Sequence, residues 1–575
     1  MKSIRCFLLA CCTILVLSTF PAFAATPTEE CSAQALYELG LFRGSDVGFE
    51  LDRTPTRSEA LVMLLRLTGA EDAALAGSWT HPFTDSGWAD HYIGYAYENG
   101  ITNGISATSF GAQSPSTAQQ YATFLLRTLG YSSEDFVYQC ATDYLLAYTP
   151  LIEIDEQHFD RGDMIVMSLA AMAAPLKDGS GTLADKMIRQ GLFTAQDYGE
   201  IRQAVSPTPT AETTVLIYMV GSDLESYRGL ATKDINEMLS AEFSDDVNVI
   251  LQTGGTTTWH NPNMLPGATQ RFQLTGNSIA HLSTLISAPM SQPSTLANFI
   301  AWGTSAYPAE RYILILWNHG GGTAYGYGLD ETTGGDSLML NELNQALTWG
   351  GTKFELIGFD ACLMATMSNA YMLSNHADYL LASAETEPLN GWMYTNWLTQ
   401  LANDPNIPIS NLAQTVAEDY LSSSKVTQEP ATLSLIALDQ MSHVMDEWQT
   451  LAPQLCDSLS SGNYDLFFDA ILATKQYSAG YFYDQFDMID WLYKLEERQI
   501  ANTSSLRNAI QTSILFVKNN EYIPESCGLA IYYPFQKPEN YFQNDIRSAL
   551  LGGTLSGQDI SFWDLLISNI YENGT

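Results

Sequence analysis

Two stretches of the sequence decide the fold: Arg311-Tyr-Ile-Leu-Ile-Leu-Trp-Asn-His-Gly-Gly-Gly322 and Phe354-Glu-Leu-Ile-Gly-Phe-Asp-Ala-Cys-Leu-Met364. Each is an apolar run short enough for a buried strand, and each ends in a turn that carries one reactive side chain. In an open parallel sheet, the carboxyl ends of neighbouring strands border one crevice. The two stretches therefore predict that His319 and Cys362 face each other.

An imidazole beside a thiol is sufficient for nucleophilic catalysis by cysteine, because the thiolate attacks the substrate while the histidine accepts and donates protons. A cysteine in an apolar context is more often a small core residue. However, His319 precedes three glycines, which give up side-chain packing for close backbone approach. The order and spacing also match those of caspase-type histidine and cysteine pairs. We therefore interpret His319 and Cys362 as a catalytic pair.

Strands and helices alternate around these two stretches. This pattern predicts an α/β fold with a mainly parallel sheet covered by helices on both faces. The last third of the chain is interpreted as an extension of the sheet with a helical layer. The predicted strands are Val215–Val220, Val247–Thr253, Ile313–Trp317, Phe354–Phe359, Tyr379–Ala384 and Ala431–Leu438.

The chain before residue 204 has a different pattern, with three similar amphipathic helices about fifty to sixty residues apart. They lie within Thr54–Gly69, Ser114–Gly130 and Phe159–Met172. In the first, Thr56 is the expected N-cap, with Glu59 three residues later. Each helix is paired with a second one that ends in glycine, which predicts an all-α repeat domain.

The 575-residue length predicts several domains. Residues 1–24 carry the marks of a secretory signal peptide with an Ala-x-Ala site ending at Ala24. We expect the repeats to fill 25–203, a Pro/Thr linker 204–213, and the α/β domain 214–575. No later run is apolar enough to cross a membrane.

Five cysteines follow the signal peptide, and their odd number leaves at least one thiol unpaired. Pairing of Cys31 with Cys140 stays open. The net charge of −39 argues against nucleic acid as a partner and favours cationic substrates, although acidic secreted proteins in general share such a charge.

From Thr213 onward, the chain resembles the clostripain family of cysteine peptidases. The resemblance rests on five segments in family order: Thr213–Glu225, the Trp-Asn-His-Gly-Gly-Gly turn, Gly358–Met364, Ala382–Trp392 and Tyr483–Asp490. It implies a caspase-like fold and an exported cysteine endopeptidase that cuts after Arg or Lys. In that family the His/Cys dyad suffices, so we expect no third catalytic residue.

On this resemblance, Cys362 is the nucleophile and His319 the general acid/base, and the N–H groups of Gly320 and Cys362 form the oxyanion site. Asp360 matches the position that selects a basic residue before the cut, although a capping or turn role stays open for it. Glu385 and Glu387 are expected to reinforce its charge.

The N-terminal repeats resemble S-layer homology modules, which implies binding to the cell-wall polysaccharide of Gram-positive bacteria. Arg57 is the expected contact for an acidic wall sugar, because a guanidinium suits bidentate carboxylate capture. A helix-start pair of Arg57 with Glu59 is the alternative. The equivalent site is lost in the second repeat at 117–120 and altered in the third at 160–163.

The sequence lacks a Gly-x-Ser-x-Gly elbow, a His-Glu-x-x-His zinc helix and a Gly-Lys-Ser/Thr phosphate loop. We expect no metal and no cofactor. Calcium stays open because some members of the resembled family depend on it, but Asp484–Asp487 lacks the spacing of a calcium loop. Protein or peptide substrates at the cell surface are the expected partners. The alternative function is a wall-anchored adhesin or scaffold with an inactive peptidase fold.

Overall fold

The computed structural model describes residues 27–44, 48–146, 149, 154–178, 180–205, 210–285, 288–478, 483–534 and 564–566. The chain divides into two compact units, Met1–Thr208 and Pro209–Thr575. The expected signal peptide, residues 1–24, lies outside the described residues. Among those described, no helix has the length and apolar character needed to span a bilayer.

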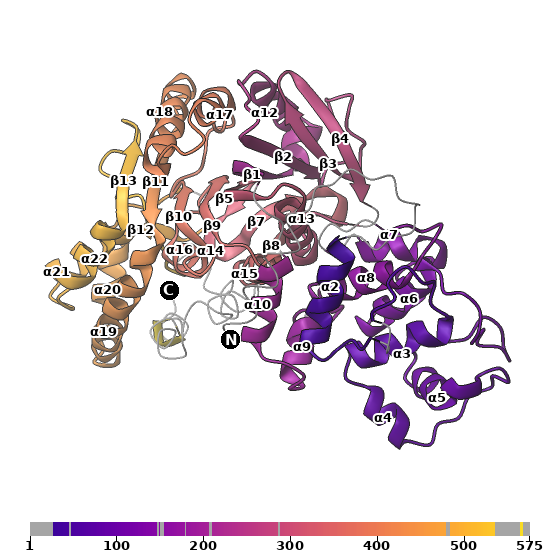
Figure 1. Cartoon of the computed structure of the whole chain (residues 1–575). Coiled ribbons are helices and arrows are strands. Elements are labelled where there is room, and N and C mark those ends of the chain that lie inside the picture. Colours follow the sequence, from indigo (N-terminus) through magenta and orange to yellow (C-terminus); the bar gives the residue numbers. More distant parts are fainter. Residues whose placement is uncertain are drawn as a thin grey trace, which may run out of the picture. The chain divides into compact units, whose positions relative to one another are not determined.

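The first unit is helical over its described residues (Figure 1). Three central helices, α3 (Arg57–Leu67), α6 (Ala118–Thr128) and α8 (Arg161–Met172), correspond to the three amphipathic patterns of the sequence. Helix α6 packs against both others. The predicted N-cap is confirmed: the Thr56 side chain accepts the Glu59 N–H, and the Glu59 carboxylate accepts the Thr56 N–H.

Further helices of this unit surround the three central ones, and together they enclose one apolar core. They are α2 (Pro27–Glu38), α4 (Glu71–Ala76), α5 (Asp90–Glu98), α7 (Ala141–Leu146), α9 (Leu183–Arg189) and α10 (Ala195–Val205). Helix α10 extends into the start of the predicted linker at 204–213, and the first strand, β1 (Ala211–Val220), begins before its end. Its residues 206–209 lie outside the described part.

The second unit is built on a nine-stranded sheet in the order β13-β11-β10-β9-β5-β1-β2-β3-β4. Its five central strands are mutually parallel, which confirms the predicted fold class. These strands are β1, β2 (Val247–Gly254), β5 (Ala309–Trp317), β9 (Phe354–Asp360) and β10 (Ala377–Ala382).

Antiparallel strands complete both edges of the sheet. On one edge, β11 (Thr432–Ala437) and β13 (Ile514–Asn519) confirm that the last third extends the sheet. The other edge is the hairpin β3 (Thr269–Thr275) and β4 (Ser278–Leu285), which the sequence pattern did not reveal. Strand β14 (Ala530–Tyr532) pairs with β12 (Gln485–Asp487) in a separate small sheet.

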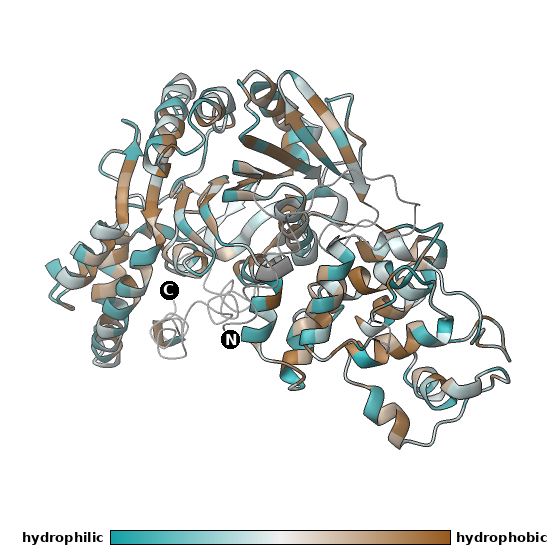
Figure 2. Cartoon of the chain, viewed as in Figure 1, coloured by the Kyte–Doolittle hydropathy of each residue, from teal (hydrophilic) through white to brown (hydrophobic). Residues whose placement is uncertain are grey.

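Alternate residues of the central strands enter two different cores, as the two-residue period of a strand requires. In β1, Leu216 and Tyr218 pack on one face, and Val215 and Ile217 on the other. One core is covered by α13 (Pro293–Ala306), α15 (Leu340–Gly350), α16 (Met367–Leu373) and α19 (Met441–Ser460). The other is covered by α12 (Leu230–Leu239), α17 (Tyr394–Asn403) and α18 (Ile409–Thr427), above the sheet in Figure 1. Figure 2 shows the central strands as largely hydrophobic.

Candidate active site

The register of β5 and β9 brings the two reactive side chains to one end of the sheet. Trp317 pairs with Asp360, and the Asn318 N–H donates to the Asp360 carbonyl over 3.3 Å. His319 and Cys362 each lie two residues beyond this pair. The structure therefore places both at the carboxyl ends of adjacent parallel strands, where ligands of such sheets bind.

Close packing of the two turns explains why a glycine follows His319. A methyl group added to Gly320 would lie 2.0 Å from the carbonyl oxygen of Cys362, closer than any side chain tolerates. The backbones after the two strands therefore approach each other directly.

A cavity of about 970 Å³ lies over this strand end, and it is lined by His319, Gly320 and Cys362 together. Its far wall is formed by the segment that connects the two strands, including Tyr325–Leu329 and Gly335–Ser337. Asp223, Asp336 and Glu342 also line it, and no Lys or Arg does so within the described chain. The cavity is large enough for a peptide segment and favours a cationic one.

The Cys362 thiol is held by a loop that follows β10. The Glu387 N–H donates to Sγ of Cys362 over 3.1 Å. Burial raises the pKa of this thiol to about 12, although that N–H lowers it. In the substrate-free protein the thiol is therefore neutral, and attack on a carbonyl requires a proton acceptor.

The imidazole of His319 is anchored by a residue that the sequence reading did not select. Nε2 of His319 lies 2.8 Å from Oδ1 of Asp223. Burial opposes ionisation of Asp223, but the hydrogen bond and charge of His319 leave its pKa below the usual value. Asp223 follows the end of β1 and lies within the matched segment Thr213–Glu225. The sequence signal that could have identified Asp223 is its place just after β1, the strand that pairs with β5.

Asp360 does not line the cavity but lies beneath it. Its carboxylate is 5% exposed and accepts hydrogen bonds from the Tyr394 hydroxyl over 2.8 Å and from the Trp392 N–H over 3.2 Å. Gly391 lies directly against it. Burial raises the pKa of Asp360 to about 6, although these hydrogen bonds lower it. Gly391 and Trp392 thus cover the Asp360 carboxylate.

Glu385 and Glu387 differ in their surroundings. Glu385 accepts hydrogen bonds from the N–H groups of Thr386 and Ser478, which fixes two loops together. The Glu387 carboxylate is buried beside Asp360 and the Trp392 side chain. Burial and then the Asp360 charge raise the pKa of Glu387 well above its usual value, since the two acids interact directly. Glu387 and Asp360 thus form a buried acidic pair, whereas the carboxylate of Glu385 is bonded to backbone N–H groups.

In the first unit, Arg57 is 6% exposed, and its guanidinium stacks on two aromatic rings, Phe110 at 4.9 Å and Phe124 at 4.8 Å. It forms no ion pair within the described residues, and its Nε lacks an acceptor there. The alternative pairing with Glu59 is wrong, because Glu59 instead binds Arg53 at 2.8 Å. Burial lowers the pKa of Arg57 to about 10, so the side chain remains a cation at neutral pH.

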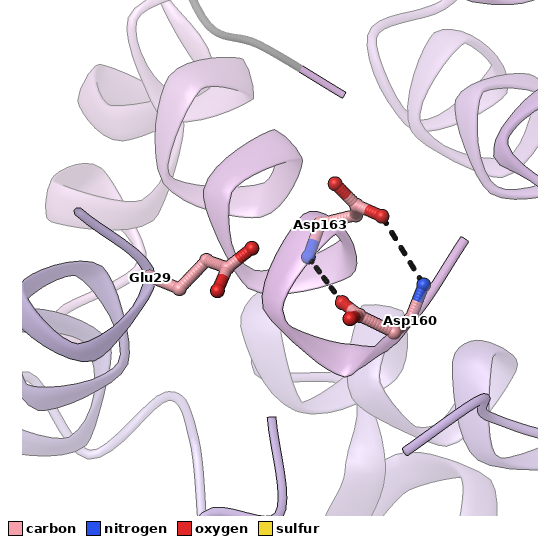
Figure 3. Close-up of side chains that lie close together, drawn as sticks. All are labelled: Glu29, Asp160 and Asp163. Atoms are coloured by element: carbon pink, nitrogen blue, oxygen red, sulfur yellow. Dashed lines mark hydrogen bonds between the residues drawn. The ribbon is translucent and has the colours of Figure 1, made fainter. Parts of the chain in front are cut away.

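Glu29, Asp160 and Asp163 form the one group of carboxylates that could hold a cation among the described residues (Figure 3). Asp160 and Asp163 already serve the helix α8, because each accepts the other's backbone N–H. Figure 3 shows Glu29 reaching toward them from another helix. None of the five described cysteines forms a disulfide, so the open pairing of Cys31 with Cys140 is not formed.

Comparison with known proteins places these features in a family context. The model of the clostripain family matches residues 217–544. Over 115 residues the chain is 34% identical to clostripain of Hathewaya histolytica, covering 17% of this chain and 22% of that protein. Over 174 residues it is 29% identical to a cell surface protein of Thermoanaerobacter kivui, covering 27% and 21% of the two chains. The chain thus matches about a fifth of the length of these relatives.

Solved structures also resemble the chain. A secreted C11 cysteine protease from Bacteroides thetaiotaomicron superposes with a TM-score of 0.45 at 19% identity, covering 59% of this chain and 99% of that one. An inactive zymogen C11 protease from Parabacteroides distasonis gives a TM-score of 0.47 at 22% identity, covering 61% and 99%.

Proposed function

The chain belongs to the clostripain family, and from this premise we propose that it is a cysteine endopeptidase acting at the cell surface. One observation carries the proposal: the paired ends of β5 and β9 bring His319 and Cys362 to the wall of one cavity. Cys362 attacks the scissile carbonyl, and His319 takes the thiol proton and returns it to the leaving amine. The N–H groups of Gly320 and Cys362 stabilise the tetrahedral oxyanion.

We propose that the enzyme cuts after Arg or Lys. In the acidic pair Asp360–Glu387, the N–H of Glu387 also contacts Cys362, and Lys233, the cation that acts on Asp360, is itself paired with Asp234 and Glu237. A basic side chain that reached Asp360 by displacing Gly391 and Trp392 would add a counter-charge to the pair. A neutral side chain would leave the buried carboxylates unpaired, which disfavours it.

The test is cleavage of a mixed-sequence peptide library by the purified chain that begins at Ala25, with the new termini identified by mass spectrometry. We expect internal cuts after Arg or Lys, and we expect the same cuts in EDTA because the proposed reaction uses no metal. A parent protein that cleaves nothing would favour the alternative of an adhesin or scaffold with an inactive peptidase fold.

A second proposal concerns the first unit, which we infer holds the protein on the cell wall through S-layer homology repeats. Arg57 supports it, because a buried cation without an anionic partner is suited to an acidic sugar. Two relatives named for the cell surface support this location. One is the cell surface protein of T. kivui. The other is a middle cell wall protein of Brevibacillus brevis, which is 29% identical over 106 residues, covering 18% of this chain and 10% of that protein.

Sedimentation with purified Gram-positive wall sacculi tests this second proposal. The inactive Cys362→Ala chain is expected to sediment, and Arg57→Gln in that background is expected to weaken sedimentation. Arg53→Gln is the matched control, because Arg53 is a neighbouring arginine that already pairs with Glu59. Equal binding by the Arg57 variant would remove this residue from the site.

A further inference from the structure

The hydrogen bond between Asp223 and His319 determines which ring nitrogen of the histidine is free. Nε2 lies 2.8 Å from the Asp223 carboxylate, and the ring forms no other hydrogen bond within the described part of the chain. A carboxylate accepts but does not donate hydrogen bonds. Nε2 must therefore carry the proton in the neutral ring, which leaves a lone pair on Nδ1.

Asp223 is held in place by contacts to the residue before His319. The side-chain amide of Asn318 donates to the Ser222 hydroxyl over 2.9 Å and also to the Val220 carbonyl. The Ser222 N–H in turn donates to the Gly255 carbonyl over 3.0 Å. Ser222 has a φ of 49°, a left-handed conformation that a serine adopts only when its surroundings impose it.

These contacts couple two strand ends, because residues 318 and 319 each bond to the turn that follows β1. Asp223, His319 and Cys362 also line the same cavity. A carboxylate that holds the imidazole from a neighbouring strand end has the geometry of an orienting group, which fixes both the ring direction and the tautomer.

We propose that Asp223 is a positioning residue that fixes the Nε2–H tautomer of His319, so that Nδ1 is the atom that exchanges protons with Cys362 and the leaving amine. This inference rests on the proposed peptidase function and adds a third residue to the expected dyad. In this role Asp223 acts through His319, to which its carboxylate is bonded.

The S–H bond of Cys362 breaks as its sulfur attacks the scissile carbonyl carbon, and the proton moves to Nδ1 of His319. The resulting imidazolium keeps its Nε2–H bonded to the Asp223 carboxylate, which stabilises the positive charge. The Nδ1 proton then passes to the leaving amine as the C–N bond breaks, which regenerates the neutral ring.

The first test is independent of activity. The ¹⁵N spectrum of histidine-labelled Cys362→Ala protein at pH 8 gives the tautomer of His319, assigned by comparison with the His319→Gln, Cys362→Ala double variant. We expect a protonated Nε2 and an unprotonated Nδ1. Adding Asp223→Asn, whose amide can donate to Nε2, is expected to move the ring toward the Nδ1–H form. A dominant Nδ1–H form with Asp223 intact would overturn the proposal.

The second test is kinetic. We expect Asp223→Asn to lower kcat by about 10²-fold to 10⁴-fold with KM nearly unchanged, because the ring would present the wrong nitrogen. Asp446→Asn, at an exposed position of α19, is the matched control and should keep full activity. Retention of kcat within twofold by Asp223→Asn would contradict the proposal. Inactivity of the parent enzyme would instead refute the peptidase function, while the ¹⁵N spectrum would still decide the tautomer.

Discussion

The backbone N–H of Glu387 lies 3.1 Å from Sγ of Cys362, so the loop that carries one member of the acidic pair also contacts this thiol. Glu387 belongs to the same segment as Trp392, whose N–H binds Asp360. Displacement of this segment by a basic side chain would therefore act on the thiol and on the buried carboxylates together. On the proposed function, one short stretch of backbone therefore links recognition of a basic side chain to the surroundings of the Cys362 thiol.

Burial of Cys362 predicts how it reacts without substrate. With its pKa raised to about 12, only a small fraction of this thiol is ionised at neutral pH, and the fraction grows as the pH rises. The rate of Cys362 alkylation by iodoacetamide, followed by mass spectrometry of its peptide, should increase steadily between pH 6 and pH 10. A rate that levels off below pH 8 would mean that the thiolate is already formed in the resting enzyme.

The acidic pair predicts a pH-dependent specificity. A carboxyl group with a pKa of about 6 is protonated below that pH and binds a cation only above it. The ratio of kcat/KM for an Arg substrate to that for the matching Gln substrate should therefore rise as the pH increases through about 6. Taking the ratio removes effects of the dyad, which are common to both substrates.

Asp360→Asn should lower this ratio by roughly 10²-fold and make it independent of pH, because the buried charge pair with the substrate is lost. Preferred cutting after neutral residues by the parent enzyme would show that Asp360 does not set specificity.

The close packing of Gly320 predicts that a larger residue at this position would disturb the site by steric clash alone. In Gly320→Ala, the new methyl group would lie 2.0 Å from the Cys362 carbonyl oxygen, so the two turns must move apart. We expect kcat/KM to fall by about 10²-fold, since misplacement of a catalytic group by about 1 Å has that effect. Gly199→Ala in helix α10 is the control, because a methyl group there meets nothing within 4 Å. Equal activity of the two variants would show that the turns tolerate separation.

Lys353 predicts that the enzyme remains a single chain. It is the one Lys or Arg between His319 and Cys362. Its side chain is 61% exposed and pairs with Asp378. However, the N–H of the next residue, Phe354, donates to the His376 carbonyl over 2.8 Å at the start of β9. Cutting there requires this strand end to open.

A denaturing gel of freshly purified and of stored enzyme checks this prediction, with the Cys362→Ala protein as the uncut reference. One band of full length is expected in each lane. A pair of fragments joined at Lys353–Phe354 would show that the strand end opens readily enough for self-cleavage.

The central strands were predictable from sequence because each carries a continuous apolar run, as strands buried on both faces do. The edge hairpin β3–β4 was not, because polar residues interrupt it and its β4 strand is largely exposed. Likewise, the capped helix α3 was predictable from the spacing of Thr56 and Glu59.

The part of the site that lies at the ends of two adjacent strands was predictable from sequence. The placement of His319 and Cys362 follows from two apolar runs with turns at their ends. The contact of His319 with Asp223 spans 96 residues of sequence and depends on β1 lying beside β5, an order that local pattern does not determine. Burial of Asp360 beneath Gly391 similarly depends on the path of a loop, which spacing alone does not indicate.

The most direct measurement of the central claim is kcat/KM of the Cys362→Ala and His319→Ala variants on a peptide cut by the parent enzyme. Cys456→Ala and His443→Ala are the matched controls, because these residues lie on α19 and outside the cavity lining. The account predicts that both dyad variants lose at least about 10³-fold, while both controls keep the parent value. Retention of parent activity by either dyad variant would contradict it.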